Sequence, residues 1–308
     1  MRKNKKNILI TGVDGFIGYH LAKRLYLDFN IFGIDKNRHL KRIKRSSLKK
    51  YYCLNLDNYN KLKILNNFKF DYIFHLGAFS KPSKAELNPE SAISSNIIGT
   101  INMLKIAKKS RNCRFIFSSA GAIYNNIPKY IPIDEKHSID PLQSIYAASK
   151  RSCEHLINDE IKFNNMNAIY FRLFNTFGPS QDKDFLIPSF INQAKKKNFI
   201  NIINGKIVRD FNYVDNVIDA FILSMNSSYK GGPINLGTGR GEKIFKIAKI
   251  IAKKFDINVK DRRNPNTFGP KVQIVNYNYA KRILNWRPKI GLEEGILKTI
   301  KSFTNPNN

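Results

Sequence analysis

The chain has 308 residues, enough for one large domain or two, and its hydrophobic fraction of 42% suits a globular protein. Its formal net charge of +30 would suit a nucleic-acid-binding protein. The basic residues, however, are spread from end to end without an RNA- or DNA-binding motif, so we expect no specific nucleic-acid partner. A positive surface also attracts smaller anions such as nucleotides.

The sequence also disfavours a membrane-spanning protein and a protein stabilised by disulfides or a metal. No apolar run approaches the roughly 18 residues of a membrane span, so no membrane partner is expected. The cysteines Cys53, Cys113 and Cys153 are far apart and show neither metal spacing nor a disulfide framework. We therefore expect a cytoplasmic protein without a metal site.

The N-terminal segment has the pattern of a strand, a glycine turn, a helix, a second strand and an acid. The apolar run 8–11 precedes Gly12-Val13-Asp14-Gly15-Phe16-Ile17-Gly18, and a second apolar run, 31–34, ends at Asp35. Glycines allow the backbone to approach a pyrophosphate closely, and a helix N-terminus favours negative charge. Asp35 can bind an adenosine ribose and would repel a 2′-phosphate, which favours NAD over NADP.

Further strand-like segments follow along the chain. Asn55-Leu56-Asp57 closes a third short strand, and 71–78 is expected to form a fourth strand and its turn. Segment 115–124 is expected to form a fifth strand and a second turn, and 171–179 contains a sixth strand. The alternation of strands with helical stretches is typical of parallel sheets.

Tyr146 and Lys150 stand four residues apart in a stretch of about 20 residues that looks helical. Positions i and i+4 lie on one face of a helix. Opposite charges about 4 Å apart interact by roughly 4 kcal/mol at an effective dielectric constant of 20. Such a contact could lower a tyrosine pKa by up to roughly 3 units, since one unit is about 1.4 kcal/mol. The pair therefore predicts a general base.

The pattern Gly-x-x-Gly-x-x-Gly together with Tyr-x-x-x-Lys resembles the extended short-chain dehydrogenase/reductase superfamily. More narrowly, the chain is similar to the NAD-dependent nucleotide-sugar epimerase/dehydratase family over nearly its whole length. The resemblance implies a doubly wound parallel Rossmann-type sheet and a smaller C-terminal substrate lobe. We expect the NAD-binding domain over 1–175, with a returning segment near 210–240, and the nucleotide-sugar lobe over 176–308.

The same resemblance implies which residues form the site. It assigns catalysis to Tyr146 and Lys150, and Ser119, next to the family's usual hydroxyl position, is our candidate for the hydroxyl. It assigns the substrate's diphosphate to Asn175, Arg209 and Arg263. The residues that it places around NAD are Gly12, Gly15, Phe16, Ile17, Gly18, Asp35, Asn55, Leu56, Leu76, Gly77, Ala78, Asn96, Ser118, Tyr146, Lys150 and Phe174.

Ala120 is the most informative departure from the family pattern, because a Ser or Thr usually completes the triad there. Ser118, Ser119 or a water could supply the missing hydroxyl, or activity could be reduced. Family dehydratases carry an Asp-Glu pair just after this position, and decarboxylases usually carry a Glu. Ala120-Gly121-Ala122 supplies no acid or base, so elimination chemistry is disfavoured.

The resemblance therefore implies an NAD-dependent 4-epimerase of a UDP-hexose or UDP-N-acetylhexosamine, working through a transient 4-keto sugar. A nucleotide-sugar 4-ketoreductase or another member of the family is the alternative. A non-catalytic NAD- or nucleotide-binding protein is the third possibility, suggested by Ala120 and the basic surface. The helix around 89–108 and the one starting at Tyr146 resemble the family's four-helix dimer interface, so we expect a homodimer.

Overall fold

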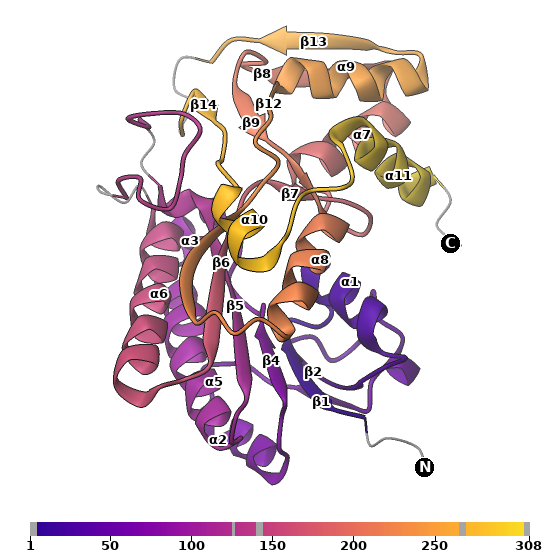
Figure 1. Cartoon of the computed structure of the whole chain (residues 1–308). Helices are drawn as coiled ribbons and strands as arrows, with labels where there is room; N and C mark the ends of the chain where they lie inside the picture. Colours follow the sequence, from indigo (N-terminus) through magenta and orange to yellow (C-terminus); the bar gives the residue numbers. More distant parts are fainter. Residues whose placement is uncertain (1–4, 125–126, 140–143, 265–268, 305–308) are drawn as a thin grey trace. The chain divides into compact units, whose positions relative to one another are not determined.

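The computed structural model describes residues 5–124, 127–139, 144–264 and 269–304 (Figure 1). The chain divides into two compact units, which are described separately. The first unit comprises residues 1–123, 141–172 and 220–234, and the second comprises 124–140, 173–219 and 235–308. Each unit is thus assembled from three separate stretches of the chain.

The first unit is built on a seven-stranded sheet with the order β11-β6-β5-β4-β1-β2-β3. Strands β1 to β5 pair in parallel with their neighbours. The order reverses at β1, which lies between β2 and β4, and ligands of such sheets bind beyond the carboxyl ends of the strands at that point. This arrangement confirms the predicted Rossmann-type fold. The strands are β1 Asn7–Thr11, β2 Asn30–Asp35, β3 Lys50–Cys53, β4 Tyr72–His75, β5 Arg114–Ala120, β6 Ala168–Leu173 and β11 Gly231–Leu236.

The third strand ends earlier than the sequence suggested. β3 ends at Cys53, and Asn55-Leu56-Asp57 forms the connection to helix α2 (Tyr59–Leu62) instead of closing the strand. Asn58 caps that helix by accepting a hydrogen bond from the Lys61 amide. Asn and Asp favour turns and helix caps over strands, which explains the difference.

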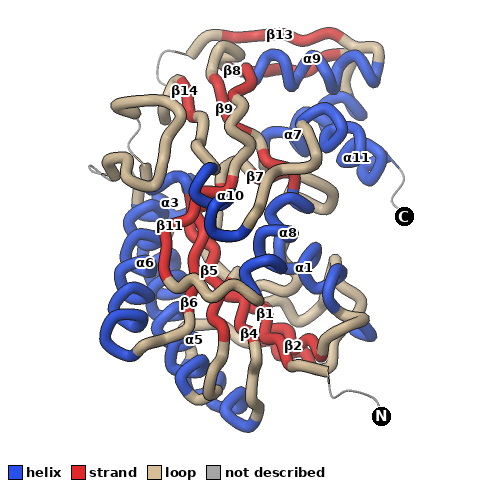
Figure 2. Tube along the Cα trace, viewed as in Figure 1, coloured by secondary structure: helices blue, strands red, loops and turns tan. Residues whose placement is uncertain are grey.

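Helices cover both faces of this sheet (Figures 1 and 2). On one face, side chains of β1, β4 and β5 form a buried cluster with Met103, Leu104 and Ile106 of α5 and with Cys153 of α6. On the other face, the Phe221 ring of α8 contacts Phe74 and Phe171. A sheet buried on both sides explains the continuous apolar runs. The helical elements of or entering this unit are α1 Phe16–Leu25, η1 Arg45–Ser47, α2 Tyr59–Leu62, η2 Lys63–Asn67, α3 Pro82–Leu87, α4 Pro89–Ile93, the π-helical turn η3 Ser94–Ile98, α5 Gly99–Lys108, η4 Gly121–Ile123, α6 Ile145–Asn164 and α8 Val214–Met225.

The described part of the second unit contains three small sheets. In them β10 pairs with β7, β9 lies between β12 and β14, and β13 pairs with β8. The Asn216 carbonyl accepts a 2.8 Å hydrogen bond from the Trp286 indole, whose ring is buried. The elements are β7 Thr176–Phe177, α7 Leu186–Lys196, β8 Phe199–Ile203, β9 Val208–Asp210, β10 Asn212–Tyr213, β12 Gly241–Lys243, α9 Ile244–Phe255, β13 Asn258–Arg262, β14 Val272–Gln273, α10 Asn278–Leu284 and α11 Leu292–Thr304.

Within the described ranges, every helix is too short or too polar to cross a membrane. Cys53 is exposed, Cys113 and Cys153 are buried, and all three thiols are free.

Candidate active site

The glycine turn after β1 is held against the turn after β4. Gly12 has a φ of +65°, and a Cβ on it would lie 2.8 Å from Gly77 Cα. A Cβ on Gly18 would lie only 2.1 Å from the Gly12 carbonyl oxygen. Helix α1 begins with Phe16, Ile17 and Gly18, and neither a capping side chain nor an acid occupies its first turn. Its N–H groups and positive dipole end therefore suit a phosphate.

Asp35 ends β2 beside this turn. Its Oδ2 accepts a 3.2 Å hydrogen bond from the Asp14 amide, and its Oδ1 accepts one of 3.2 Å from the Asn37 amide. Burial raises the pKa of the Asp35 carboxyl, and these two hydrogen bonds oppose that rise. Because β1 and β2 are neighbouring parallel strands, the carboxylate and the glycine turn share one edge of the sheet.

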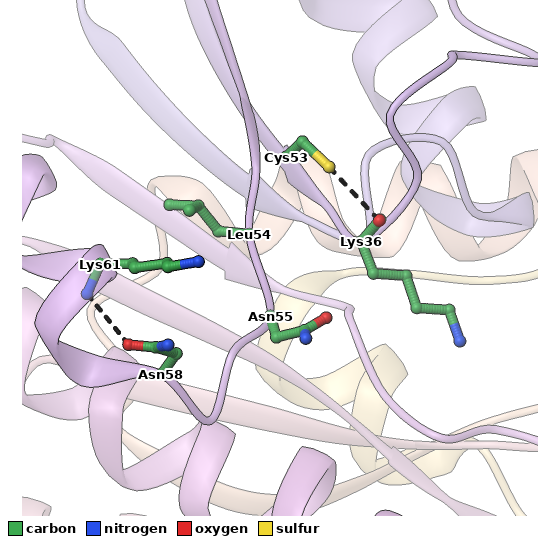
Figure 3. A pocket seen from close by; sticks show the side chains of 6 residues that line it. All are labelled: Lys36, Cys53, Leu54, Asn55, Asn58 and Lys61. Carbon is green, nitrogen blue, oxygen red and sulfur yellow. Dashed lines mark hydrogen bonds between the residues drawn. The ribbon is translucent and has the colours of Figure 1, made fainter.

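A pocket of about 130 Å³ lies beyond the end of β3 (Figure 3). Among the residues proposed to bind the cofactor, Asn55 lines it. Leu56 instead packs against the turns, since a Cβ on Gly77 would lie 2.8 Å from Leu56 Cδ1. The Leu56 side chain therefore packs against Gly77, and Gly77 packs against Gly12 of the glycine turn. The pocket is lined by Lys36, Cys53, Leu54, Asn55, Asn58 and Lys61.

A buried chain of hydrogen bonds fixes the turn Leu76-Gly77-Ala78. The amides of Leu76 and Gly77 donate to Thr11 Oγ1 at 3.1 and 2.9 Å, and that hydroxyl lies 2.9 Å from His75 Nδ1. His75 Nε2 lies 3.0 Å from Thr100 Oγ1, which donates to the Asn96 carbonyl. Burial lowers the pKa of His75 to about 3, so the ring is neutral. His75 thus serves packing and orientation, and no local sequence pattern pointed to Thr11.

Asn96 connects this turn to the helix that carries the tyrosine and the lysine. It lies on the π-helical turn η3, a geometry found often at functional sites. Its Oδ1 accepts from the Phe79 amide at 2.7 Å, and its Nδ2 donates to Ser149 Oγ at 2.9 Å. The buried Asn96 amide therefore holds the α6 turn next to Lys150.

Tyr146 and Lys150 lie one turn apart near the start of α6. Lys150 is 3% exposed, its Nζ donates to the Ser118 carbonyl at 2.8 Å, and it stands 4.7 Å from the centroid of the Phe117 ring. Burial lowers the pKa of Lys150 to about 8. Burial also raises the pKa of the half-buried Tyr146 above its ordinary value. The direction for the Tyr146 pKa is opposite to the one expected from the spacing to Lys150, because desolvation disfavours the charged phenolate.

The Ser119 hydroxyl is engaged in a buried network. It donates to Glu154 Oε1 at 2.6 Å, and Arg172 contacts both oxygens of that carboxylate at 2.9 and 2.7 Å. Arg151 adds a 3.0 Å contact to Oε2. Glu154 lies one helical turn after Lys150, so the network ties α6 to the ends of β5 and β6. Sequence reasoning placed Ser119 but did not predict where its proton points.

The remaining expected residues belong to the second unit. Phe174 is buried with its ring stacked on Tyr124 at 5.9 Å. Asn175 Nδ2 donates to the Asp210 carbonyl at 3.0 Å, which places it near Arg209, the preceding residue in β9. Arg209 is half-buried and donates to the Val208 carbonyl at 2.9 Å. Arg263 is exposed just after β13, which belongs to a different sheet from β9.

Among the described residues, no group of three or more His, Cys, Asp or Glu side chains is placed to hold a metal ion.

A doubly wound sheet with this glycine turn, an acid at the end of the second strand, and Tyr and Lys on the helix after β5 defines an extended short-chain dehydrogenase/reductase. Residues 9–299 match the family model described as GDP-mannose 4,6 dehydratase. The chain belongs to this family of NAD-dependent nucleotide-sugar epimerases and dehydratases.

Relatives in this family have several activities. UDP-glucuronate 4-epimerase of Thermodesulfobacterium geofontis is 29% identical, over 95% of this chain and 94% of its own length. UDP-glucuronic acid decarboxylase 4 of Arabidopsis thaliana is 28% identical, over 98% of this chain and 70% of its own. The structure of UDP-glucose 4-epimerase from Thermotoga maritima with UDP-glucose has a TM-score of 0.91 at 28% identity, covering 98% of this chain and 100% of that one.

Burial of the Lys150 ammonium predicts a specific dependence of stability on pH. Between its folded pKa of about 8 and its ordinary value of 10.5, the unfolded chain binds a proton at Lys150 that the folded chain does not. The free energy of unfolding of the wild type should therefore rise relative to that of Lys150→Met, by up to about 3 kcal/mol between pH 7 and pH 10.5. Urea unfolding of both proteins across this range measures the difference. A difference that is independent of pH would contradict the buried ammonium.

Proposed function

We propose that this protein is an NAD-dependent 4-epimerase of a UDP-hexose or UDP-N-acetylhexosamine. The observation that carries the proposal is the combination of Tyr146 and Lys150 on α6 with the small residues Ala120-Gly121-Ala122 at the end of β5. The first pair supports oxidation and reduction at a sugar carbon. The second stretch offers no acid or base for removing water or carbon dioxide, which disfavours the dehydratase and decarboxylase activities of other family members.

NAD fits the residues of the first unit. In the turn 12–18 the glycines let the backbone pack closely on itself and on Gly77, which sets the start of α1. No side chain caps the N–H groups there, and these groups would face a pyrophosphate. Asp35 can accept hydrogen bonds from an adenosine ribose, and its charge opposes a 2′-phosphate. Asn55 lines the pocket that would receive the adenine side. When bound, NAD supplies the acceptor for hydride from the sugar C4 and the donor for its return.

In this mechanism Tyr146 Oη removes the proton of the C4 hydroxyl and later returns one. Because the pKa of Tyr146 is raised, the phenol keeps its proton in the protein without bound cofactor or substrate. A positive charge at Lys150 favours the phenolate, and with a pKa of about 8 that charge is largely present at neutral pH. One of the three Lys150 donors is bound to the Ser118 carbonyl, so two others can serve the nicotinamide ribose and Tyr146.

Ser119 has a narrower role in this proposal than a triad hydroxyl. Its proton points to Glu154, so toward the substrate it offers acceptor lone pairs and not a donor. Ala120 offers no polar side chain at all. Asn175, Arg209 and Arg263 would hold the diphosphate, for which the planar guanidinium is well suited. The sugar then rotates about this diphosphate so that hydride returns to its other face.

Incubation with single nucleotide sugars, a trace of NAD and no added reductant tests this function. We expect many turnovers to the C4 epimer of a UDP-hexose or UDP-N-acetylhexosamine, because the cofactor is regenerated in each cycle. UDP-glucuronate belongs in the same panel, since a relative acts on it. Stoichiometric consumption of NADH or NADPH with a 4-keto sugar would instead identify a ketoreductase, and release of carbon dioxide from UDP-glucuronate would identify a decarboxylase.

The variant Tyr146→Phe should lose nearly all turnover while retaining NAD, because only the proton-transfer group is removed. Steady-state kinetics and titration with NAD measure the two properties separately. Tyr170→Phe is a matched control: Tyr170 is also a tyrosine of the first unit, and its hydroxyl accepts from Asn158 at 3.0 Å. The control should keep its turnover. Unchanged turnover in Tyr146→Phe would overturn the mechanism.

We also propose a homodimer, formed through helices of the first unit. Leu87, Ile93 and Ile98 on the segment from α3 to η3 are 80%, 43% and 41% exposed, and Phe163 of α6 is 71% exposed. Light scattering should give about twice the chain mass of 35.5 kDa for the wild type and the chain mass for Leu87→Lys/Ile93→Lys. Ile203→Lys, at an apolar position 54% exposed in the second unit, should stay dimeric. A monomeric wild type would contradict this interface.

A further inference from the structure

Asp14 places a buried carboxylate inside the glycine turn, although it neither belongs to the glycine pattern nor takes part in the mechanism above. It is 1% exposed. Its Oδ2 accepts from the Lys41 amide at 2.9 Å, and its Oδ1 accepts from the amides of Arg42 and Ile43 at 2.7 and 3.2 Å. The Arg42 guanidinium donates to the Asp14 carbonyl at 3.0 Å. One aspartate therefore holds three consecutive backbone amides of a segment 27 to 29 residues away.

That segment is the most basic stretch of the chain. We name residues 36–50 the basic segment; it contains eight lysines and arginines and no acid. Ile43 and Leu48 are buried at 5% and 6% exposure, whereas most of its charged side chains are exposed. The eight are Lys36, Arg38, Lys41, Arg42, Lys44, Arg45, Lys49 and Lys50.

The basic segment connects the parts of the expected dinucleotide site. It starts directly after Asp35, and its first residue, Lys36, lines the pocket with Asn55 (Figure 3). Asp14 binds both Asp35 and the basic segment. Its backbone amide donates to Asp35 Oδ2, and its carboxylate accepts from the amides of residues 41–43. A carboxylate that accepts several N–H groups forms strong, charge-assisted hydrogen bonds. The segment is thereby fixed beside the turn 12–18.

We propose that Asp14 is a positioning residue for the cofactor, and that the basic segment it anchors attracts the phosphates of the dinucleotide. The inference rests on the proposed NAD cofactor but not on the sugar chemistry. As a bare negative charge within the turn, Asp14 would oppose a diphosphate. As an anchor it holds Lys41 and Arg42, and with them the adjacent Lys44 and Arg45, beside this turn, whereas Lys49 and Lys50 lie toward the amino ends of β2 and β3. Four positive charges outweigh one negative charge in their effect on an anionic ligand.

These two roles predict opposite effects of Asp14→Asn on NAD binding. The amide keeps the size of the side chain but loses the charge and one of the two acceptor oxygens. If Asp14 is an anchor, the affinity for NAD should fall about tenfold, with kcat at saturating NAD unchanged. Hydrogen exchange at amides 41–43 should speed up without any ligand. Asp28→Asn, at an exposed aspartate of the same unit, is the control and should change neither property.

Calorimetric titration with NAD and hydrogen exchange are the measurements. Equal or tighter NAD binding in Asp14→Asn would overturn the inference while leaving the proposed function intact. Absence of NAD binding in the wild type would overturn both the role of Asp14 and the proposed NAD-dependent function. Should Asp14→Asn fail to fold, the exposed charges can be removed instead by Lys41→Gln/Lys44→Gln/Arg45→Gln. This variant should bind NAD more weakly and with a smaller dependence on salt, whereas Lys249→Gln/Lys253→Gln/Lys254→Gln on α9 should match the wild type.

Discussion

The proposed chemistry depends on one buried cation. Lys150 is almost completely enclosed, with its ammonium on the Ser118 carbonyl and against the Phe117 ring. Burial of an ammonium is unfavourable, and the lowered pKa of Lys150 is the direct consequence. A protein keeps such a group only if its surroundings hold it in place. The same charge that costs stability is the one available to a phenolate at Tyr146, so stability and activity oppose each other at this position.

The surroundings of Lys150 are polar networks that connect separate strands and helices. Glu154 joins α6 to β5 and β6 through Ser119 and Arg172, while Asn96 joins α6 to the turn after β4 through Phe79. Thr11 and His75 extend that second network to the glycine turn. Each of these polar side chains makes hydrogen bonds to other parts of the protein. These hydrogen bonds connect the elements at the carboxyl edge of the sheet to one another, which would position the reacting groups of the proposed site.

The sequence predicted the local parts of this arrangement better than the long-range ones. The run 8–11, the glycines and Asp35 follow one another closely, so their strand, turn and helix could be recognised from spacing alone. The spacing of Tyr146 and Lys150 predicted their common helix face, but a spacing carries no information about burial, and burial raises the pKa of the tyrosine. The proton of Ser119 and the carboxylate of Asp14 bind partners 35 and 27 to 29 residues away, beyond any local pattern.

Hydride return within one active site is the central claim, and an isotope label at the sugar C4 tests it directly. The substrate that turns over is prepared with deuterium at C4 and converted in ordinary water with catalytic NAD. If the protein is a 4-epimerase of the proposed kind, the product should retain the deuterium at C4 with inverted configuration. Loss of the label to water, or its release on free reduced cofactor, would contradict the account.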